Sequence, residues 1–217
     1  MDQAVVIGVL ALVGAAWGFA ADRLAARWPQ HEDGSIRPID WRTPLVVVVG
    51  AVAVPLVVER YATLPTTLLV FGVYVAALVV LLATDLDQRL LPDVITLPLI
   101  ALAAIVLVSG SSIFIHTTED VLWAVGASIL VPAALYALSI PFGRGAIGQG
   151  DLKLLVSVGL LTGSANLFYA LIGGALLAGI VVGALLFVRR ISMKTYVPYG
   201  PFLIAGILWV MLGLPQR

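Results

Sequence analysis

The sequence contains no cysteine among its 217 residues and only two histidines, His31 and His116. The missing thiols exclude disulfide bonds, thiolate nucleophiles and zinc sites that are built on cysteine pairs. The two histidines lie far apart in the sequence and give no indication of a metal site. Chemistry that depends on cysteine or on a histidine cluster is therefore not expected.

Charged side chains are scarce, at 11% of the residues against about 25% in an ordinary soluble domain. Hydrophobic residues make up 61% of the chain. The twelve basic and twelve acidic residues balance to a net charge of zero, so the composition gives no argument for a nucleic-acid partner. We expect an integral membrane protein whose surroundings are the lipid bilayer.

Uncharged stretches close to the length that crosses a bilayer, about 20 residues, recur along the chain. We expect an all-α, polytopic membrane protein with about eight transmembrane helices, forming a single membrane-embedded domain over residues 1–217. The second and sixth expected helices are short for a full span, and a polar loop over residues 22–43 follows the first helix. The expected helices cover residues 3–21, 43–58, 61–84, 94–115, 121–142, 151–162, 165–188 and 197–213.

The basic residues predict how these helices are oriented. With the N-terminus outside, ten of the twelve Lys and Arg residues fall on the cytoplasmic side, and only Arg60 and Arg217 fall outside. The opposite orientation reverses this ratio, whereas cytoplasmic loops normally carry the excess of Lys and Arg. We therefore expect a multi-pass protein of the cell membrane with its N-terminus outside.

Two short polar segments interrupt the apolar sequence, at residues 84–93 and 148–153. Ionisable groups beside a membrane span are costly to hold there, so they are candidates for a functional site. Both segments fall on the cytoplasmic side of the expected topology. The residues of interest are Asp85, Asp87 and Asp93 in the first segment and Gly148, Gly150, Asp151 and Lys153 in the second.

Asp85 and Asp151 are the candidates for a catalytic pair of carboxyl groups. Two carboxyl groups held close together at a shielded boundary do not both ionise easily, so one stays protonated while the other is a base. The base would take a proton from water, and the acid would hydrogen-bond a peptide carbonyl oxygen and then protonate the leaving amine. The sequence alone does not bring these two residues together in space.

The same residues also have structural interpretations. Asp93 and Asp151 stand where helices are expected to start, and an aspartate there commonly caps the backbone. Asp87 and Arg89 are most simply explained as solvated loop charges. Lys153 is most simply explained as an anchor whose ammonium group extends to the membrane interface.

The polar segments resemble the motifs of the prepilin peptidases, the type IV leader peptidases among the Gly-x-Gly-Asp intramembrane aspartic proteases. The matching segments lie at residues 85–99, 148–155 and 197–203, in the order that the family has. The third is similar to the family's Pro-Phe-Gly-Pro-Phe segment at the start of the last helix. Its matching residues are Pro198, Gly200 and Pro201.

The resemblance implies that Asp85 and Asp151 are catalytic. It implies an aspartic endopeptidase with eight helices that cuts the leader peptide from type IV prepilins or related pseudopilins at the cytoplasmic face of the membrane. No metal or other cofactor is expected for proteolysis. The supporting residues would be Gly148, Gly150, Lys153, Asp87, Asp93, Pro198, Gly200 and Pro201.

The N-terminal part departs from the family pattern. Bifunctional members carry a larger cytoplasmic loop with two zinc-binding Cys-x-x-Cys pairs, whereas residues 22–43 contain no cysteine. Residues 16–23 are at best a degenerate match to the family's Gly-Ser-Phe-Leu-Asn segment. We expect a short form of the family that cleaves, and the sequence leaves methylation of the new N-terminus by S-adenosylmethionine open.

Two other kinds of protein would use the same aspartates. An ion- or proton-coupled transporter would bind a cation or relay protons through them, and broken helices near residues 148–150 and 198–201 suit that hypothesis. A membrane scaffold would use them only as helix caps. Replacing the aspartates by asparagine distinguishes the scaffold from the other hypotheses. Asparagine caps a helix about as well as aspartate, so the replacement would have little effect on a scaffold.

Overall fold

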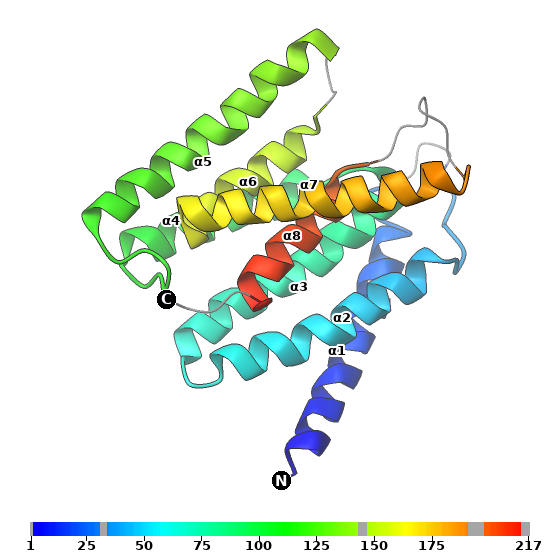
Figure 1. Cartoon of the computed structure of the whole chain (residues 1–217). Helices are drawn as coiled ribbons and strands as arrows, with labels where there is room; N and C mark the ends of the chain where they lie inside the picture. The colour runs from blue at the N-terminus through cyan, green and yellow to red at the C-terminus, as the bar shows by residue number, and fades with distance from the viewer. Residues whose placement is uncertain (1, 31–33, 143–146, 191–197, 214–217) are drawn as a thin grey trace.

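A computed structural model describes residues 2–30, 34–142, 147–190 and 198–213. These residues fold into helices and connecting segments without a β-strand, which confirms the expected all-α class (Figure 1). A short 3-10 helix, Ile140–Phe142, follows α5. The α-helices are α1 (Gln3–Ala25), α2 (Arg42–Tyr61), α3 (Pro65–Gln88), α4 (Asp93–Val108), α5 (Thr118–Ser139), α6 (Gln149–Thr162), α7 (Ser164–Phe187) and α8 (Gly200–Gly213).

Five of these helices, α1, α2, α3, α5 and α7, are long and apolar enough to cross a membrane. Helices α4 and α8 are apolar but shorter. Helix α2 is longer than expected, because it continues to Tyr61, whose buried hydroxyl donates to the carbonyl oxygen of Met211 at 2.7 Å. Helix α6 has only 14 residues, as the break predicted near residue 163 requires.

Several helix ends differ from the expected ones. Helix α3 begins at Pro65 rather than at residue 61. Proline is well suited to the first turn of a helix, because the N–H group that it lacks would have no acceptor within the helix there. Helix α4 ends at Val108 rather than at residue 115, and Gly110 then takes a left-handed conformation with φ of 66°. Glycine adopts this conformation without the steric cost that a Cβ atom brings.

Helix α3 is the central element of the fold (Figure 1). It contacts α1, α2, α4 and α8, and the side chains of Leu78 and Leu81 on it are fully buried. The hydroxyl group of the buried Tyr74 donates to the carbonyl oxygen of Leu99, which ties α3 to α4. The end of α3 is therefore held from several sides, and this end carries Asp85.

A buried ion network joins the α1–α2 loop to the same end of α3. Asp22, fully buried at the end of α1, accepts hydrogen bonds from Arg37 and, at 2.8 Å, from the hydroxyl group of Thr43. The Nε atom of Arg37 lies 2.7 Å from Oδ1 of Asp87, and Nη1 of Arg42 lies 3.1 Å from the same oxygen. These ion pairs attach the polar loop to α3 at Asp87. Asp85 lies on the same helix, two residues earlier.

Arg37 remains charged in this network. Burial by itself would lower the pKa of the Arg37 guanidinium. The hydrogen bond to Asp22 and the negative charges of Asp22, Asp87 and Asp40 act in the other direction and raise the pKa above its usual value. The network is therefore ionic at any physiological pH.

Replacing Arg37 by methionine is expected to lower the free energy of unfolding by about 3–5 kcal/mol, because it removes one of the two arginines that pair with the buried carboxylate of Asp22, the other being Arg23, and also removes a partner of Asp87. The measurement is unfolding in mixed SDS micelles, followed by tryptophan fluorescence. Arg27→Met is the matched control, since Arg27 is exposed on the same loop. Equal stability of the two variants would contradict an energetic role for the network.

Candidate active site

A pocket of about 430 Å³ opens between the end of α3, the segment that follows it and the first turn of α6. Both candidate carboxylates line it, although they come from helices that are far apart in the sequence. Arg89, Asp93 and Lys153 contribute to the rest of its wall. The structure therefore brings together the two polar segments that the sequence singles out.

Asp85 lies in the last turn of α3 and is only 5% exposed. Its Oδ2 atom is buried and has no hydrogen-bond partner among the described residues. An unpaired buried oxygen of this kind destabilises the fold, so its presence calls for an explanation other than stability. The backbone N–H of Arg89, which ends α3 in a left-handed conformation, donates to the carbonyl oxygen of Asp85 at 2.9 Å.

Asp151 is the third residue of α6 and is the second carboxylate of the pocket. Its Oδ1 atom is also buried without a hydrogen-bond partner among the described residues. The capping interpretation of Asp151 is wrong, because Gly148 occupies the N-cap position and no side chain caps this helix. Asp151 therefore shares the wall of one pocket with Asp85.

Gly150 determines how closely α6 approaches the segment that follows α3. A Cβ atom at Gly150 would lie 2.5 Å from the Cβ of Leu91 and 3.0 Å from the carbonyl oxygen of Leu91. The first distance is shorter than real Cβ contacts and the second is tight, so a side chain here would force Leu91 or α6 to move. The close approach brings the start of α6, with Asp151, to the pocket that Asp85 also lines. Gly148 lies beside the Asp151 carboxylate, because a Cβ atom added to it would lie 3.1 Å from Oδ2 of Asp151.

Gly200 covers the other side of Asp85. It is buried at the first position of α8, and a Cβ atom on it would lie 2.7 Å from Cγ of Asp85 and 2.9 Å from its Oδ1. Pro198 and Pro201 flank this glycine, and a proline in the first turn of a helix costs no backbone hydrogen bond. The third sequence segment thus forms part of the wall around Asp85.

Lys153 and Asp93 form an ion pair at the rim of the pocket, with an Nζ-to-Oδ1 distance of 2.6 Å. Asp93 is exposed at the first position of α4, and its N-cap position is taken by Pro92 without a side-chain hydrogen bond. The capping interpretation of Asp93 is therefore wrong. Lys153 does not stand alone as an interface anchor, because its ammonium group is paired.

Asp87 lies outside the pocket. Its side chain is 2% exposed and pairs with Arg37 and Arg42, so its interpretation as a solvated loop charge is wrong. Sequence reasoning also missed the contribution of Asp22 and Arg37. The only available signal was their position in a short, charged loop, and this signal does not identify their partner on α3.

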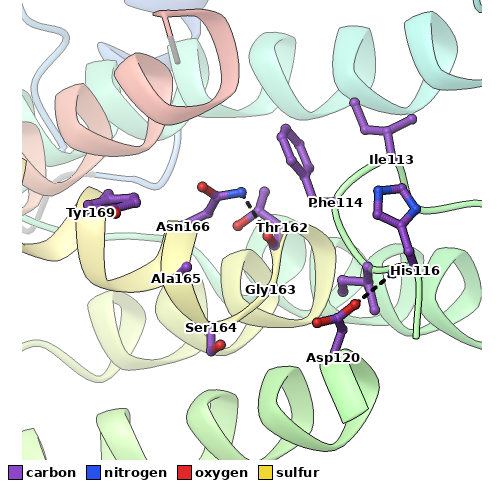
Figure 2. A pocket seen from close by; sticks show the side chains of 11 residues that line it. Ile113, Phe114, His116, Asp120, Thr162, Gly163, Ser164, Ala165, Asn166 and Tyr169 are labelled. Atoms are coloured by element: carbon purple, nitrogen blue, oxygen red, sulfur yellow. Dashed lines mark hydrogen bonds between the residues drawn. The ribbon is translucent and has the colours of Figure 1, made fainter. Parts of the chain in front are cut away.

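A second cavity, of about 310 Å³, lies at the opposite end of α6 (Figure 2). Its carboxylate, Asp120, accepts hydrogen bonds from the backbone N–H groups of His116 and Thr117 and completes the cap of α5. The side-chain amide of Asn166 donates to the carbonyl oxygen of Thr162 at 2.9 Å (Figure 2). These polar groups serve local structure.

The body of α6 separates the two cavities. Its side chains Leu154, Leu155, Val158 and Leu161 are fully or almost fully buried in the core that α4 and α5 share with it. Within the described ranges, no three His, Asp or Glu residues come together to hold a metal ion. The first pocket is therefore the site where the sequence motifs and the buried, unpaired carboxylates coincide.

Comparison with known proteins identifies the family to which the sequence is similar. A model of the type IV leader peptidase family matches residues 72–184, a stretch that contains both Asp85 and Asp151. Over 176 residues the chain is 34% identical to a prepilin leader peptidase/N-methyltransferase from Pseudomonas putida, a match that covers 81% of the chain. Over 184 residues it is 31% identical to proteins of the same name from Dickeya chrysanthemi and Aeromonas hydrophila, with 81% and 82% of the chain covered.

The chain matches only part of these relatives. The matched regions cover 60% of the Pseudomonas putida protein, 62% of the Dickeya chrysanthemi protein and 60% of the Aeromonas hydrophila protein. No solved structure matches the chain significantly.

Proposed function

The chain belongs to the type IV leader peptidase family, and we propose on this basis that it is an aspartic endopeptidase that removes the leader peptide from type IV prepilins or related pseudopilins. One observation carries the proposal. Two carboxyl groups from separate sequence segments line one pocket, and each has a buried oxygen without a hydrogen-bond partner among the described residues. Carboxyl groups that line a common pocket and keep hydrogen-bonding capacity that no described residue uses are candidates to bind a substrate and a water molecule.

We assign the chemistry to Asp85 and Asp151 acting together. The ionised member of the pair removes a proton from water, and the water oxygen attacks the carbonyl carbon of the scissile peptide. The protonated member hydrogen-bonds the carbonyl oxygen as it becomes negative. A proton is then delivered to the amide nitrogen, the C–N bond breaks, and the leader carboxylate and the new amino terminus leave. The residues require no metal or organic cofactor for these steps.

Gly148, Gly150 and Gly200 support the pair by keeping side chains away from it, and Pro198 and Pro201 set the course of the chain into α8. The Lys153–Asp93 ion pair would act at the pocket mouth, where the extended substrate enters. Asp87 would support the pocket only indirectly, because its ion pairs are with Arg37 of the α1–α2 loop and Arg42 at the start of α2.

We also propose that the pocket opens on the cytoplasmic side and that the N-terminus lies outside. The end of α3 and the starts of α6 and α8 meet at the pocket. Arg37 of the α1–α2 loop and Arg42, the first residue of α2, pair with Asp87 at the same end of α3. This end of the bundle carries the basic residues that the positive-inside rule places in the cytoplasm.

The alternatives fit these contacts less well. Transport needs a polar route across the protein, whereas Leu154, Leu155, Val158 and Leu161 of α6 pack between the two cavities. A scaffold needs the aspartates as helix caps, whereas neither Asp93 nor Asp151 caps its helix. The packing of α6 and the uncapped helix starts therefore favour hydrolysis.

The test is incubation of the purified protein with a prepilin in phospholipid nanodiscs, followed by mass spectrometry of the products. We expect a free leader and a shortened pilin, in the presence of EDTA as well as without it. Parallel samples with S-adenosylmethionine show whether the shortened pilin gains the mass of a methyl group, which the names of the relatives suggest for those proteins. An intact prepilin under all conditions would refute the proposal.

A further inference from the structure

In residues 34–41 of the α1–α2 loop, the side chain of Arg37 is buried and the large apolar side chains are exposed. Arg37 is 8% exposed and lies within the ion network. Ile36, Ile39 and Trp41 are 63%, 66% and 64% exposed. A loop in contact with water normally exposes its charged side chains and buries its large apolar ones. The outer face of residues 34–41 is therefore more apolar than a surface in contact with water normally is.

The apolar face of this loop continues the lipid-facing surface of the adjoining helices. Leu24, in the last turn of α1, and Leu45 and Val48, in the first turns of α2, are exposed apolar side chains next to the loop. Because the loop joins the same ends of two helices that are long enough to span, it lies at the level where the hydrocarbon core ends.

Trp41 occupies the N-cap position of α2, at this boundary. The guanidinium carbon of Arg42 lies 5.7 Å from the centre of the Trp41 ring, a cation–π distance. Tryptophan rings flanked by a basic residue are enriched at the level of lipid headgroups, because one part of the ring is apolar and its N–H is polar. This position fits a lipid surface better than a protein partner.

We infer that residues 34–41 lie in the interfacial layer of the bilayer leaflet next to the pocket, with the side chains of Ile36, Ile39 and Trp41 inserted among the lipid headgroups and upper acyl chains. The inference does not depend on the chemistry proposed for the pocket. The inner side of the segment is bonded through Arg37 to Asp22 and Asp87. The lipid contact therefore sets the depth of the end of α3, and with it the height of Asp85 relative to the membrane surface.

The absence of cysteine makes a direct test possible, because a single introduced thiol is the only one in the chain. Ile36→Cys and Ile39→Cys each receive a nitroxide label, and the protein is placed in nanodiscs of phosphatidylethanolamine and phosphatidylglycerol without substrate. Collision rates with oxygen, which concentrates in lipid, and with a water-soluble nickel chelate are measured by electron paramagnetic resonance. Gln30→Cys in the exposed loop and Val48→Cys on the exposed face of α2 provide the water and lipid references.

We expect the ratio of oxygen to nickel collisions at positions 36 and 39 to shift away from the Gln30→Cys value toward the Val48→Cys value. A ratio equal to that of Gln30→Cys would overturn the inference and place the segment in water. Low collision rates with both reagents would also overturn it, because they would show that a second copy of the chain covers the segment. Prepilin cleavage by the labelled variants is recorded separately and does not enter this decision.

Discussion

Replacing either Asp85 or Asp151 by asparagine is expected to reduce prepilin cleavage by about 10³-fold or more, as for other members of a cooperating catalytic set. Asparagine has nearly the same size and shape as aspartate, but it neither accepts a proton from water nor donates one to a leaving amine. Because both carboxyl groups serve one step, the double variant is expected to be no worse than the more damaged single variant. Cleavage rates are measured by mass spectrometry with each variant at equal concentration.

The same substitutions separate a catalytic role from a structural one. Each removes a carboxyl oxygen that is buried without a described partner, so the variants are expected to unfold at a temperature no lower than that of the parent chain. Glu59→Gln is the matched control, because it makes the same chemical change at an exposed position at the far end of α2. Retained cleavage in Asp85→Asn or Asp151→Asn would exclude the proposed mechanism, and ion flux that depends on Asp85 would favour transport.

Gly200→Ala is expected to lower kcat by about 10²-fold while leaving the protein folded, since a displacement of about 1 Å in a catalytic group has this effect. The added methyl group would lie 2.7 Å from Cγ of Asp85, which forces the carboxyl group to move. Gly200 does not have a positive φ angle, so alanine fits the backbone at this position. The expected loss of kcat therefore arises from the contact with Asp85 alone. Kinetics of cleavage over a range of prepilin concentrations separates kcat from KM.

Gly183→Ala in α7 is the control for this prediction. A Cβ atom at Gly183 meets nothing within 4 Å, so alanine is expected to leave cleavage unchanged and to stabilise the helix by about 0.4–1 kcal/mol. If Gly200→Ala and Gly183→Ala had the same activity, the contact between α8 and Asp85 would have no part in catalysis.

The sequence predicts the helices well because the thickness of a bilayer fixes their approximate length. It also isolates Asp85 and Asp151, because carboxylates are rare in so apolar a chain. It does not predict the contact of Gly200 with Asp85, since these residues are 115 positions apart and only the packing of α8 on α3 brings them together. Local patterns do not reveal a contact of this kind.

Asp87 illustrates this limit. Its neighbours suggest a charged turn, and charges in turns are usually solvated. The structure buries it because Arg37 and Arg42, from a loop that local patterns describe only as a connector, supply two positive charges. The helix caps at Asp93 and Asp151 were predicted wrongly for a related reason, since the N-cap positions are taken by Pro92 and Gly148, which lie one and three residues before these aspartates.

The shortness of α6 affects how water arrives. Fourteen residues rise about 21 Å, roughly two thirds of a hydrocarbon core of about 30 Å. The protein is accordingly hollowed at both ends of this helix. At the Asp151 end we expect water to reach the helix start through the pocket, so the proposed hydrolysis would need no tunnel through lipid.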